Sequence, residues 1–444
     1  MSFPSGFVFG AATAAYQIEG ATTADGRGES IWDRFCRVPG KVANGDTGEP
    51  ACEHYVRWRD DLDLMRALGL RGYRFSIAWP RIQPEGRGAP NQKGLDFYRR
   101  LVEGLLEREI APLATLYHWD LPQSLQDDGG WASRGVVDRF ADYARIVFDA
   151  LGDLVDAWVT HNEPWVTSML GYGRGIKAPG ISDWRSALAA SHHALLAHGR
   201  AVGAFRAGDG NGEIGITLDL THVLGEAEAA ARLDGHRNRW FLDPVLRGAY
   251  PADILELYER RLGPLDFIRP GDVDEIEAPI DFLGVNFYRP AVARLKHDQD
   301  PVGVEEVDAE GPRTAMGWTV EPSSLTALLL RLERDYGGVP LVITENGASF
   351  DDPPLDGNAV VEDPQRLAYL RDHIAAVERA LEGGVDVRGY YVWSLLDNFE
   401  WEHGYASRFG IVAVDFDDQR RAPKRSALWY RDLIARHANG DGDG

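Results

Sequence analysis

The chain has 444 residues, of which 44% are hydrophobic and 10% aromatic, and 13 of them are tryptophan. Its formal net charge of −22 argues against binding to nucleic acid or to an anionic membrane surface, because like charges repel. The two cysteines, Cys36 and Cys52, are too few for a disulfide scaffold and favour free thiols in a reducing compartment.

Short apolar runs alternate along the chain with longer segments of helical periodicity, a pattern typical of a parallel sheet covered by helices. Eight runs predict strands, in chain order: Gly6–Ala12, Gly72–Ile77, Pro112–Tyr117, Ala157–Thr160, Ile214–Leu218, Phe282–Asn286, Leu341–Thr344 and Val387–Trp393. Single α/β barrels range from about 200 to over 400 residues. The length therefore fits one domain over residues 1–444, with a disordered tail at about residues 439–444.

Two of the connecting segments carry clear helix signals. Asp60–Leu68 is closed by Gly69, and Gln365–Leu381 follows an expected N-cap at Asp363 with proline at position 364. We therefore predict an α/β fold, a single-domain (β/α)₈ TIM barrel with loop insertions at its C-terminal face. The alternative is a doubly wound sheet, but the first strand is not followed by a Gly-rich phosphate turn.

Polar and aromatic residues follow most of the predicted strands. In a parallel barrel all these strand ends open on one face, where barrel enzymes place their active sites. Glu163 and Glu345 follow the fourth and seventh strands directly. Glycoside hydrolysis needs two such carboxyl groups, one to protonate the leaving oxygen and one to attack or to activate water. Their separation decides between retention, at about 5–5.5 Å, and inversion, at about 6.5–9.5 Å, and sequence alone leaves it open.

Five ordered motifs resemble the signatures of glycoside hydrolase family 1. They begin at Phe7 and run to about Tyr430, so the resemblance covers nearly the whole chain. The motifs are Phe7–Gly20, Thr160–Pro164, Ile343–Gly347, Trp393–Trp401 and Arg408–Val412.

The resemblance implies retention through a covalent glycosyl-enzyme intermediate, with Glu345 as nucleophile and Glu163 as general acid/base. Arg74 would lie near Glu345 and lower its pKa, and Tyr288 would hydrogen-bond to it. Apolar walls and the charge of Glu345 would raise the pKa of Glu163. The family also implies a cis peptide bond between Trp393 and Ser394.

By the same resemblance, Asn162 would contact the sugar 2-hydroxyl, Glu400 its 4- and 6-hydroxyls, and Trp393 would form the stacking floor. Trp318 would line the leaving-group side or pack within its loop. The substrate-binding residues that we expect are Gln17, His118, Trp119, Asn162, Asn286, Tyr288, Trp318, Trp393, Glu400, Trp401 and Phe409.

These residues also have plainer interpretations. Arg74 could pair with a helix carboxylate, Gln17 could be a buried loop amide, and His118 could be a core histidine. We interpret Trp79 and Trp165 as structural.

No metal or cofactor is expected. The spacing of His192, His193 and His198 is not the three or four residues that place two ligands on one helix face.

The sequence therefore predicts a retaining β-glycosidase, a β-glucosidase that acts on small β-glucosides or cello-oligosaccharides. β-Galactosidase or β-fucosidase side activity and transglycosylation are compatible with the motifs. The alternatives are a 6-phospho-β-glycosidase of the same family and a non-catalytic sugar-binding barrel. No lysine lies between Glu400 and Phe409 to hold a phosphate.

We expect a cytoplasmic protein without nucleic-acid or membrane partners. The N-terminus has no lysine or arginine before its short apolar stretch, and no apolar run approaches the ~20 residues that span a bilayer. The oligomeric state is left open.

Overall fold

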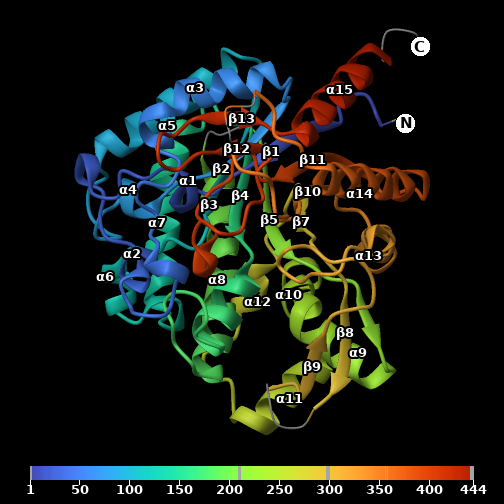
Figure 1. Cartoon of the computed structure of the whole chain (residues 1–444). Helices are drawn as coiled ribbons and strands as arrows, with labels where there is room; N and C mark the ends of the chain where they lie inside the picture. Colours follow the sequence, from blue (N-terminus) through green and yellow to red (C-terminus); the bar gives the residue numbers. More distant parts are fainter. Residues whose placement is uncertain (1–2, 209–211, 297–300, 356, 358, 441–444) are drawn as a thin grey trace.

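The computed structural model describes residues 3–208, 212–296, 301–355, 357 and 359–440. Eight parallel strands close into a barrel in the spatial order β1-β11-β10-β7-β5-β4-β3-β2, and helices surround it (Figure 1). The strands are β1 Val8–Ala12, β2 Gly72–Ser76, β3 Ala111–Tyr117, β4 Ala157–Asn162, β5 Glu213–Asp219, β7 Phe282–Asn286, β10 Leu341–Asn346 and β11 Val387–Trp393. All eight predicted strands are present, and the predicted fold class is confirmed.

The helices lie mainly between successive barrel strands. Their bounds are α1 Ala15–Ile18, α2 Ile31–Cys36, α3 His54–Ala67, α4 Trp79–Ile82, α5 Gln92–Leu106, α6 Gln123–Asp127, α7 Gly135–Leu151, α8 Trp184–Ala207, α9 Ala227–Asp234, α10 Trp240–Arg247, α11 Ala252–Leu262, α12 Asp272–Ile276, α13 Pro322–Tyr336, α14 Pro364–Glu382 and α15 Arg425–Gly440. Shorter 3-10 or π segments are η1 Ala24–Gly26, η2 Ala43–Gly45, η3 Gly130–Ala132, η4 Val166–Gly173, η5 Gly235–Arg239 and η6 Trp401–His403. No helix in the described part of the chain is long and apolar enough to cross a membrane.

Two small sheets lie outside the barrel. One is a three-stranded sheet in the order β6-β8-β9, below the barrel in Figure 1. The other pairs β12 with β13. Their bounds are β6 Val223–Gly225, β8 Ala291–Leu295, β9 Val304–Val307, β12 Val412–Val414 and β13 Arg421–Pro423.

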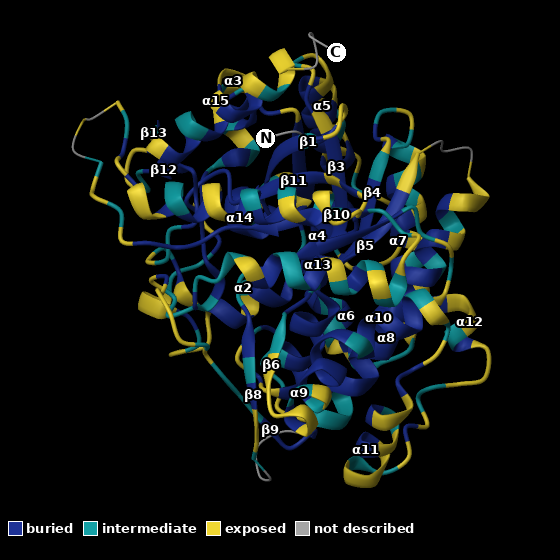
Figure 2. Cartoon of the chain, turned by 90° about the vertical axis from the view of Figure 1, so that its right-hand side faces the viewer, coloured by how far each residue is buried: buried dark blue, intermediate teal, exposed yellow. Residues whose placement is uncertain are grey.

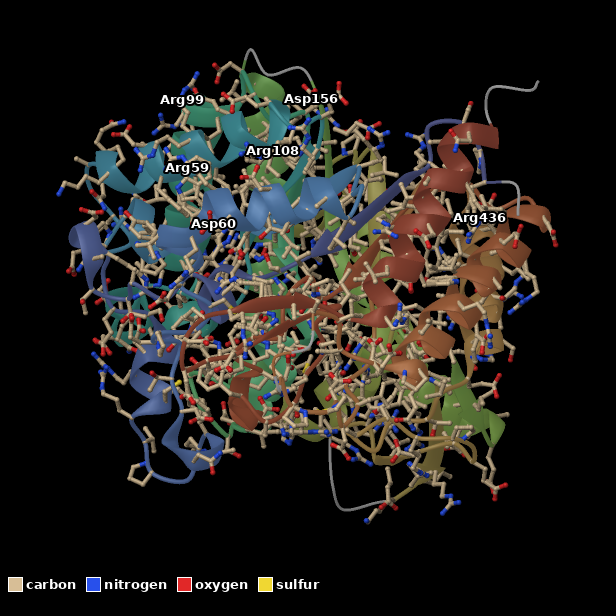
Figure 3. All side chains as sticks on the ribbon, turned by 45° about the horizontal axis from the view of Figure 1, so that its top comes forward. Arg59, Asp60, Arg99, Arg108, Asp156 and Arg436 are labelled. Atoms are coloured by element: carbon tan, nitrogen blue, oxygen red, sulfur yellow. The ribbon has the colours of Figure 1, made fainter. Side chains whose placement is uncertain are left out.

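The core consists of the barrel strands and the inner faces of the helices (Figure 2). All five residues of β2 and all five of β7 are buried, as expected of strands covered on both sides. Charged side chains cover the outer helices, such as Arg59 and Asp60 on α3 and Arg99 on α5, and Arg108 lies just after α5 (Figure 3). Charged side chains of both signs therefore lie on the surface of the helices around the buried core.

Two helix predictions need correction. Helix α3 begins at His54, six residues before the predicted start at Asp60. Asp363 precedes α14 but makes no side-chain cap, because its carboxylate accepts hydrogen bonds from Ser426 and Arg366. The expected tail overlaps α15, which continues to Gly440, and residues 441–444 lie outside the described residues.

Candidate active site

Glu163 and Glu345 occupy the mouth of the barrel. Glu345 lies in β10, which extends two residues beyond the predicted end, and Glu163 follows the last residue of β4. Their exposed fractions are only 5% and 3%. In the barrel, β5 and β7 separate β4 from β10. Two carboxyl groups are thus held at the same end of the barrel with little access to water.

Glu345 is held by a cation and a phenol. Arg74 Nη1 donates to its Oε1 at 2.6 Å, and the Tyr288 hydroxyl donates to its Oε2 at 2.5 Å. Burial raises the pKa of Glu345, and the Arg74 charge and both hydrogen bonds oppose burial by favouring the carboxylate. The predicted proximity of Arg74 and Tyr288 to Glu345 is confirmed.

Glu163 has a different environment. Its Oε1 accepts a hydrogen bond from the neutral amide of Asn286 at 2.6 Å. Burial raises the pKa of Glu163 well above its usual range, and the carboxylates of Asp219 and Glu345 raise it further. The expected direction and two expected causes are confirmed, whereas the contribution of Asp219 was not predicted.

Asn162 connects the surrounding polar groups. Its Oδ1 accepts hydrogen bonds from Arg74 Nη2 at 2.6 Å and from Asn286 Nδ2 at 3.0 Å. Burial lowers the pKa of His118, so its ring is neutral and can accept a hydrogen bond from Asn162 Nδ2 at 3.0 Å. Trp119 Nε1 donates to the Asn162 carbonyl oxygen at 3.1 Å. The Asn162 amide is thereby fixed in one orientation.

A second polar cluster contains Gln17 and Glu400. Gln17 Nε2 donates to the Phe399 carbonyl oxygen at 2.8 Å and lies 3.3 Å from Glu400 Oε2. Gln17 Oε1 is buried and has no hydrogen-bond partner among the described residues. A buried acceptor without a partner is costly, so this oxygen is suited to accept a ligand hydroxyl. Burial raises the pKa of Glu400 to about 8.

Aromatic rings enclose these polar groups. Trp393 stacks on His118 with a centroid distance of 5.7 Å, and Trp119 lies 4.6 Å from Trp401. The Trp393–Ser394 bond is cis, as predicted. Trp318 packs between Tyr288, at 5.4 Å, and Phe409, at 5.9 Å.

Three site residues adopt left-handed backbone conformations. The φ values are 78° at Trp119, 51° at Glu163 and 48° at Trp401. Such conformations cost about 1–3 kcal/mol each for residues other than glycine and cluster at functional sites. The remainder of the fold therefore stabilises the orientation of these three side chains.

A cavity of about 670 Å³ opens between the strand ends. Ten of the predicted residues line it: His118, Trp119, Glu163, Tyr288, Trp318, Glu345, Trp393, Glu400, Trp401 and Phe409. Gln17, Arg74, Asn162 and Asn286 are buried in contact with these lining residues. The structure thus brings all the predicted site residues together.

Trp165 was interpreted as structural, and this interpretation is wrong in part. The side chain is 4% exposed, yet it lines the cavity beneath the guanidinium of Arg237, whose Cζ lies 3.9 Å from the ring centroid. Its position two residues after Glu163 was a signal in the sequence. Trp79 is structural, since it stacks on Tyr143 at 4.8 Å outside the cavity lining.

Charged residues that sequence reasoning did not single out also line the cavity. Lys177 and Glu402 form an ion pair of 2.6 Å, and Asp219 and Arg237 form another of 2.7 Å. Asp219 ends β5, so the strand-end argument could have found it. Lys177 lies between η4 and α8 and Glu402 lies in η6, 225 positions apart, and neither carries a local signal.

The three histidines of α8 have structural partners. His192 lies between Tyr250 and Asp272, His193 contacts the Trp131 carbonyl oxygen, and His198 contacts Thr160. Within the described residues, no group of three or more His, Cys, Asp or Glu side chains is arranged to hold a metal ion.

Comparisons with known proteins cover the whole barrel. The sequence model of glycosyl hydrolase family 1 matches residues 1–439. "Beta-glucosidase A" of Acetivibrio thermocellus is 47% identical over 98% of this chain and 98% of its own. The "Bifunctional beta-D-glucosidase/beta-D-fucosidase" of Bifidobacterium breve is 47% identical over 99% of both chains. The structure of the β-glucosidase from Thermotoga maritima in complex with azafagomine has a TM-score of 0.94 and 45% identity, covering 98% of this chain and 99% of that one.

Proposed function

The chain belongs to glycosyl hydrolase family 1, and we propose that it is a retaining β-glucosidase that hydrolyses small β-glucosides and cello-oligosaccharides. The observation that carries the proposal is the contrast between two buried carboxyl groups at one cavity. Glu345 is paired with a guanidinium, whereas Glu163 is hydrogen-bonded to a neutral amide. The first environment suits an anionic nucleophile and the second suits a proton donor.

In the first step, a Glu345 carboxylate oxygen attacks the anomeric carbon, and the bond from that carbon to the leaving oxygen breaks. Glu163 gives its proton to the leaving oxygen, so the alcohol departs neutral. Arg74 and Tyr288 hold the Glu345 carboxylate in place for the attack. The product of this step is a glycosyl ester on Glu345 and a deprotonated Glu163.

In the second step, Glu163 accepts a proton from water as the water oxygen attacks the anomeric carbon. The ester bond breaks, and the Glu345 carboxylate leaves. The pKa of Glu163 falls in the intermediate because the Glu345 charge, one of the causes that raise it, is absent. Loss of that charge suits Glu163 to act as a base, and the second inversion restores the original configuration.

The terminal sugar is bound by the polar groups around Asn162 and Glu400. Asn162 contacts the 2-hydroxyl, a hydrogen bond that strengthens in the transition state. Glu400 accepts from the 4- and 6-hydroxyls, Gln17 Oε1 accepts from a further hydroxyl, and Trp393 forms the floor. What supports this arrangement is the unpartnered Gln17 oxygen and the burial of the Glu400 carboxyl group.

The leaving group lies between Trp165 and Trp318 at the outer part of the cavity, both of which line it. Activity on β-fucosides accompanies the glucosidase activity, as the name of the Bifidobacterium relative suggests for that protein. The protein acts in the cytoplasm, a location supported by its two free, buried thiols, Cys36 and Cys52.

A panel of nitrophenyl glycosides tests this proposal. The β-glucoside should have the highest kcat/KM, the β-fucoside should be hydrolysed, and the α-glucoside should not react. A series of gluco-oligosaccharides then measures the accepted chain length. Failure of the folded protein to hydrolyse any β-glycoside would overturn the proposal.

A further inference from the structure

A chain of alternating charges lines one wall of the cavity. Arg237 donates from Nη2 to Asp219 Oδ2 at 2.7 Å and from Nη1 to Glu306 Oε2 at 3.0 Å. Arg289 donates from Nη2 to Glu306 Oε1 at 2.6 Å and from Nη1 to Asp308 Oδ1 at 2.8 Å. The five side chains come from β5, η5, β9 and adjacent loops, and all of them line the cavity that holds Glu163.

Strand register places the inner end of this charge chain beside Glu163. The Glu163 backbone N–H donates to the Thr217 carbonyl oxygen of β5 at 2.9 Å. Asp219 lies two residues beyond Thr217, so the two side chains point to the same face of β5. Asp219 is also opposite Asn286 of β7, whose amide donates to Glu163 at 2.6 Å. The Glu163 carboxyl thus lies against the strand end that carries Asp219.

Charged and titratable groups act on Glu163 from several elements. Asp219 of β5 and Glu345 of β10 are anionic and favour the protonated form, whereas Arg74 of β2 and Arg237 of η5 are cationic and oppose it. Tyr288, in the loop after β7, is a titratable neighbour. Burial is the largest of the causes that raise the pKa of Glu163, the charge of Asp219 is the second and the charge of Glu345 is the third.

The groups around Glu163 and Asp219 decide which of these two carboxyl groups holds a proton. Burial raises the pKa of Asp219 as well, but Arg237 lowers it through a direct ion pair. Arg237 is itself held in place by Glu306 and by stacking on Trp165, 3.9 Å away. Among the side chains that the structure describes, the only donor to the Glu163 carboxyl is the neutral amide of Asn286. The pKa of Asp219 is still raised overall, but that of Glu163 is raised well above its usual range, and only Asp219 is paired with a guanidinium, so a proton between them is favoured on Glu163.

We propose that Asp219 is a positioning residue for proton transfer: clamped by Arg237, its carboxylate keeps the leaving-group proton on Glu163. This inference rests on the proposed role of Glu163 as general acid. Asp219 acts through Glu163 and takes no part in bond making or breaking. Its charge sets the upper end of the pH range over which the enzyme can protonate a poor leaving group.

The pH dependence of kcat/KM in Asp219→Asn tests the proposal. An alkyl β-glucoside is the substrate, because its leaving group needs a proton. The basic limb of the profile reports deprotonation of Glu163 in the free enzyme. Since removal of a like charge lowers the pKa of a carboxyl, the basic limb should move to lower pH by about one unit. Asp219→Ala removes the same charge and should move it in the same direction.

Asp308→Asn is the matched control. It makes the same substitution at the outer end of the charge chain, separated from Asp219 by Arg289, Glu306 and Arg237. Its basic limb should stay at the wild-type position. A dinitrophenyl glucoside needs no proton, so its kcat/KM should show no basic limb from Glu163, and Asp219→Asn should leave its pH profile unchanged.

A basic limb that stays in place in both Asp219 variants would overturn the proposal. So would an equal shift in Asp308→Asn, because that result would assign the effect to the whole charge chain. Glu163→Gln separates this failure from failure of the proposed function. If Glu163→Gln hydrolyses the alkyl glucoside at the wild-type rate, Glu163 is not the acid, and the underlying assignment is wrong.

Discussion

Arg74 and Glu345 form a buried ion pair in which Nη1 lies 2.6 Å from Oε1, and the two side chains are 1% and 3% exposed. The same guanidinium donates from Nη2 to Asn162 at 2.6 Å. One cation therefore aligns the proposed nucleophile and the residue proposed to contact the sugar 2-hydroxyl. The Arg74 guanidinium thus joins the proposed nucleophile to the proposed 2-hydroxyl contact by direct hydrogen bonds.

Replacement of the proposed nucleophile should abolish hydrolysis of β-glucosides but still permit synthesis of β-linked glycosides. Glu345→Ala should not hydrolyse β-glucosides, because the glycosyl ester cannot form. Its emptied pocket should accept an α-glucosyl fluoride, which resembles the intermediate, and transfer the sugar to an acceptor with a β-linkage. Product analysis by mass spectrometry and NMR checks this. A folded variant that still hydrolyses β-glucosides at the wild-type rate would contradict the assignment of Glu345.

Replacement of the proposed acid should affect substrates according to their leaving groups. Glu163→Ala should lose about 10²–10⁴-fold in kcat/KM on alkyl glucosides, the usual contribution of general acid catalysis. Dinitrophenyl glucoside should lose far less, since its leaving group needs no proton. Azide should accelerate the second step of the variant and yield the β-glucosyl azide. Equal losses on both substrates would remove Glu163 from this role.

The enzyme should discriminate against 6-phosphorylated sugars. A phosphate beside Glu400 would face like charge above the pKa of that carboxyl, about 8, and at lower pH it would still need a cation, but Lys177, the nearby cation, is already paired with Glu402 at 2.6 Å. We expect kcat/KM for nitrophenyl β-glucoside to exceed that of its 6-phosphate by roughly 100-fold, which corresponds to ~2.7 kcal/mol. Steady-state kinetics on both substrates measure the ratio. Better turnover of the phosphorylated substrate would favour the phospho-glycosidase alternative.

A buried cluster of charged side chains around Lys424 should contribute to the free energy of unfolding. The Lys424 side chain is 0% exposed, and its Nζ donates to Asp352 at 2.6 Å and to Asp397 at 2.7 Å. Lys424→Met leaves buried carboxylates without this partner, so the free energy of unfolding should fall by about 3–5 kcal/mol. Arg425→Met, which breaks an exposed pair with Glu362, is the control and should change it much less. Denaturant titrations measure both, and equal effects would contradict the prediction.

The barrel strands and the polar residues at their ends were predictable because their signals are local. Each strand is a short buried run, and its last residues reach the mouth of the barrel. The start of α3 was not predictable, since buried His54 and Asp61 pair at 2.7 Å on the inner face of the helix and interrupt the apolar spacing. The side-chain cap predicted for Asp363 does not form, because Ser426, far along the chain, donates a hydrogen bond to its carboxylate.

Other charged residues that line the cavity were likewise not predicted from the sequence. Asp219 follows a predicted strand, but its role depends on Arg237, which lies in an irregular helical segment between other elements. The Lys177–Glu402 pair joins two segments distant in sequence. Contacts of this kind arise only when the fold brings distant segments together, so no motif in one segment indicates them.

The anomer released first in hydrolysis tests the central claim most directly. Two successive displacements at the anomeric carbon, by Glu345 and then by water, restore the β-configuration. Proton NMR of β-glucoside hydrolysis, recorded before mutarotation, should therefore show β-glucose as the first product. Initial formation of α-glucose would show a single displacement and contradict the assignment of Glu345 as nucleophile and Glu163 as acid/base.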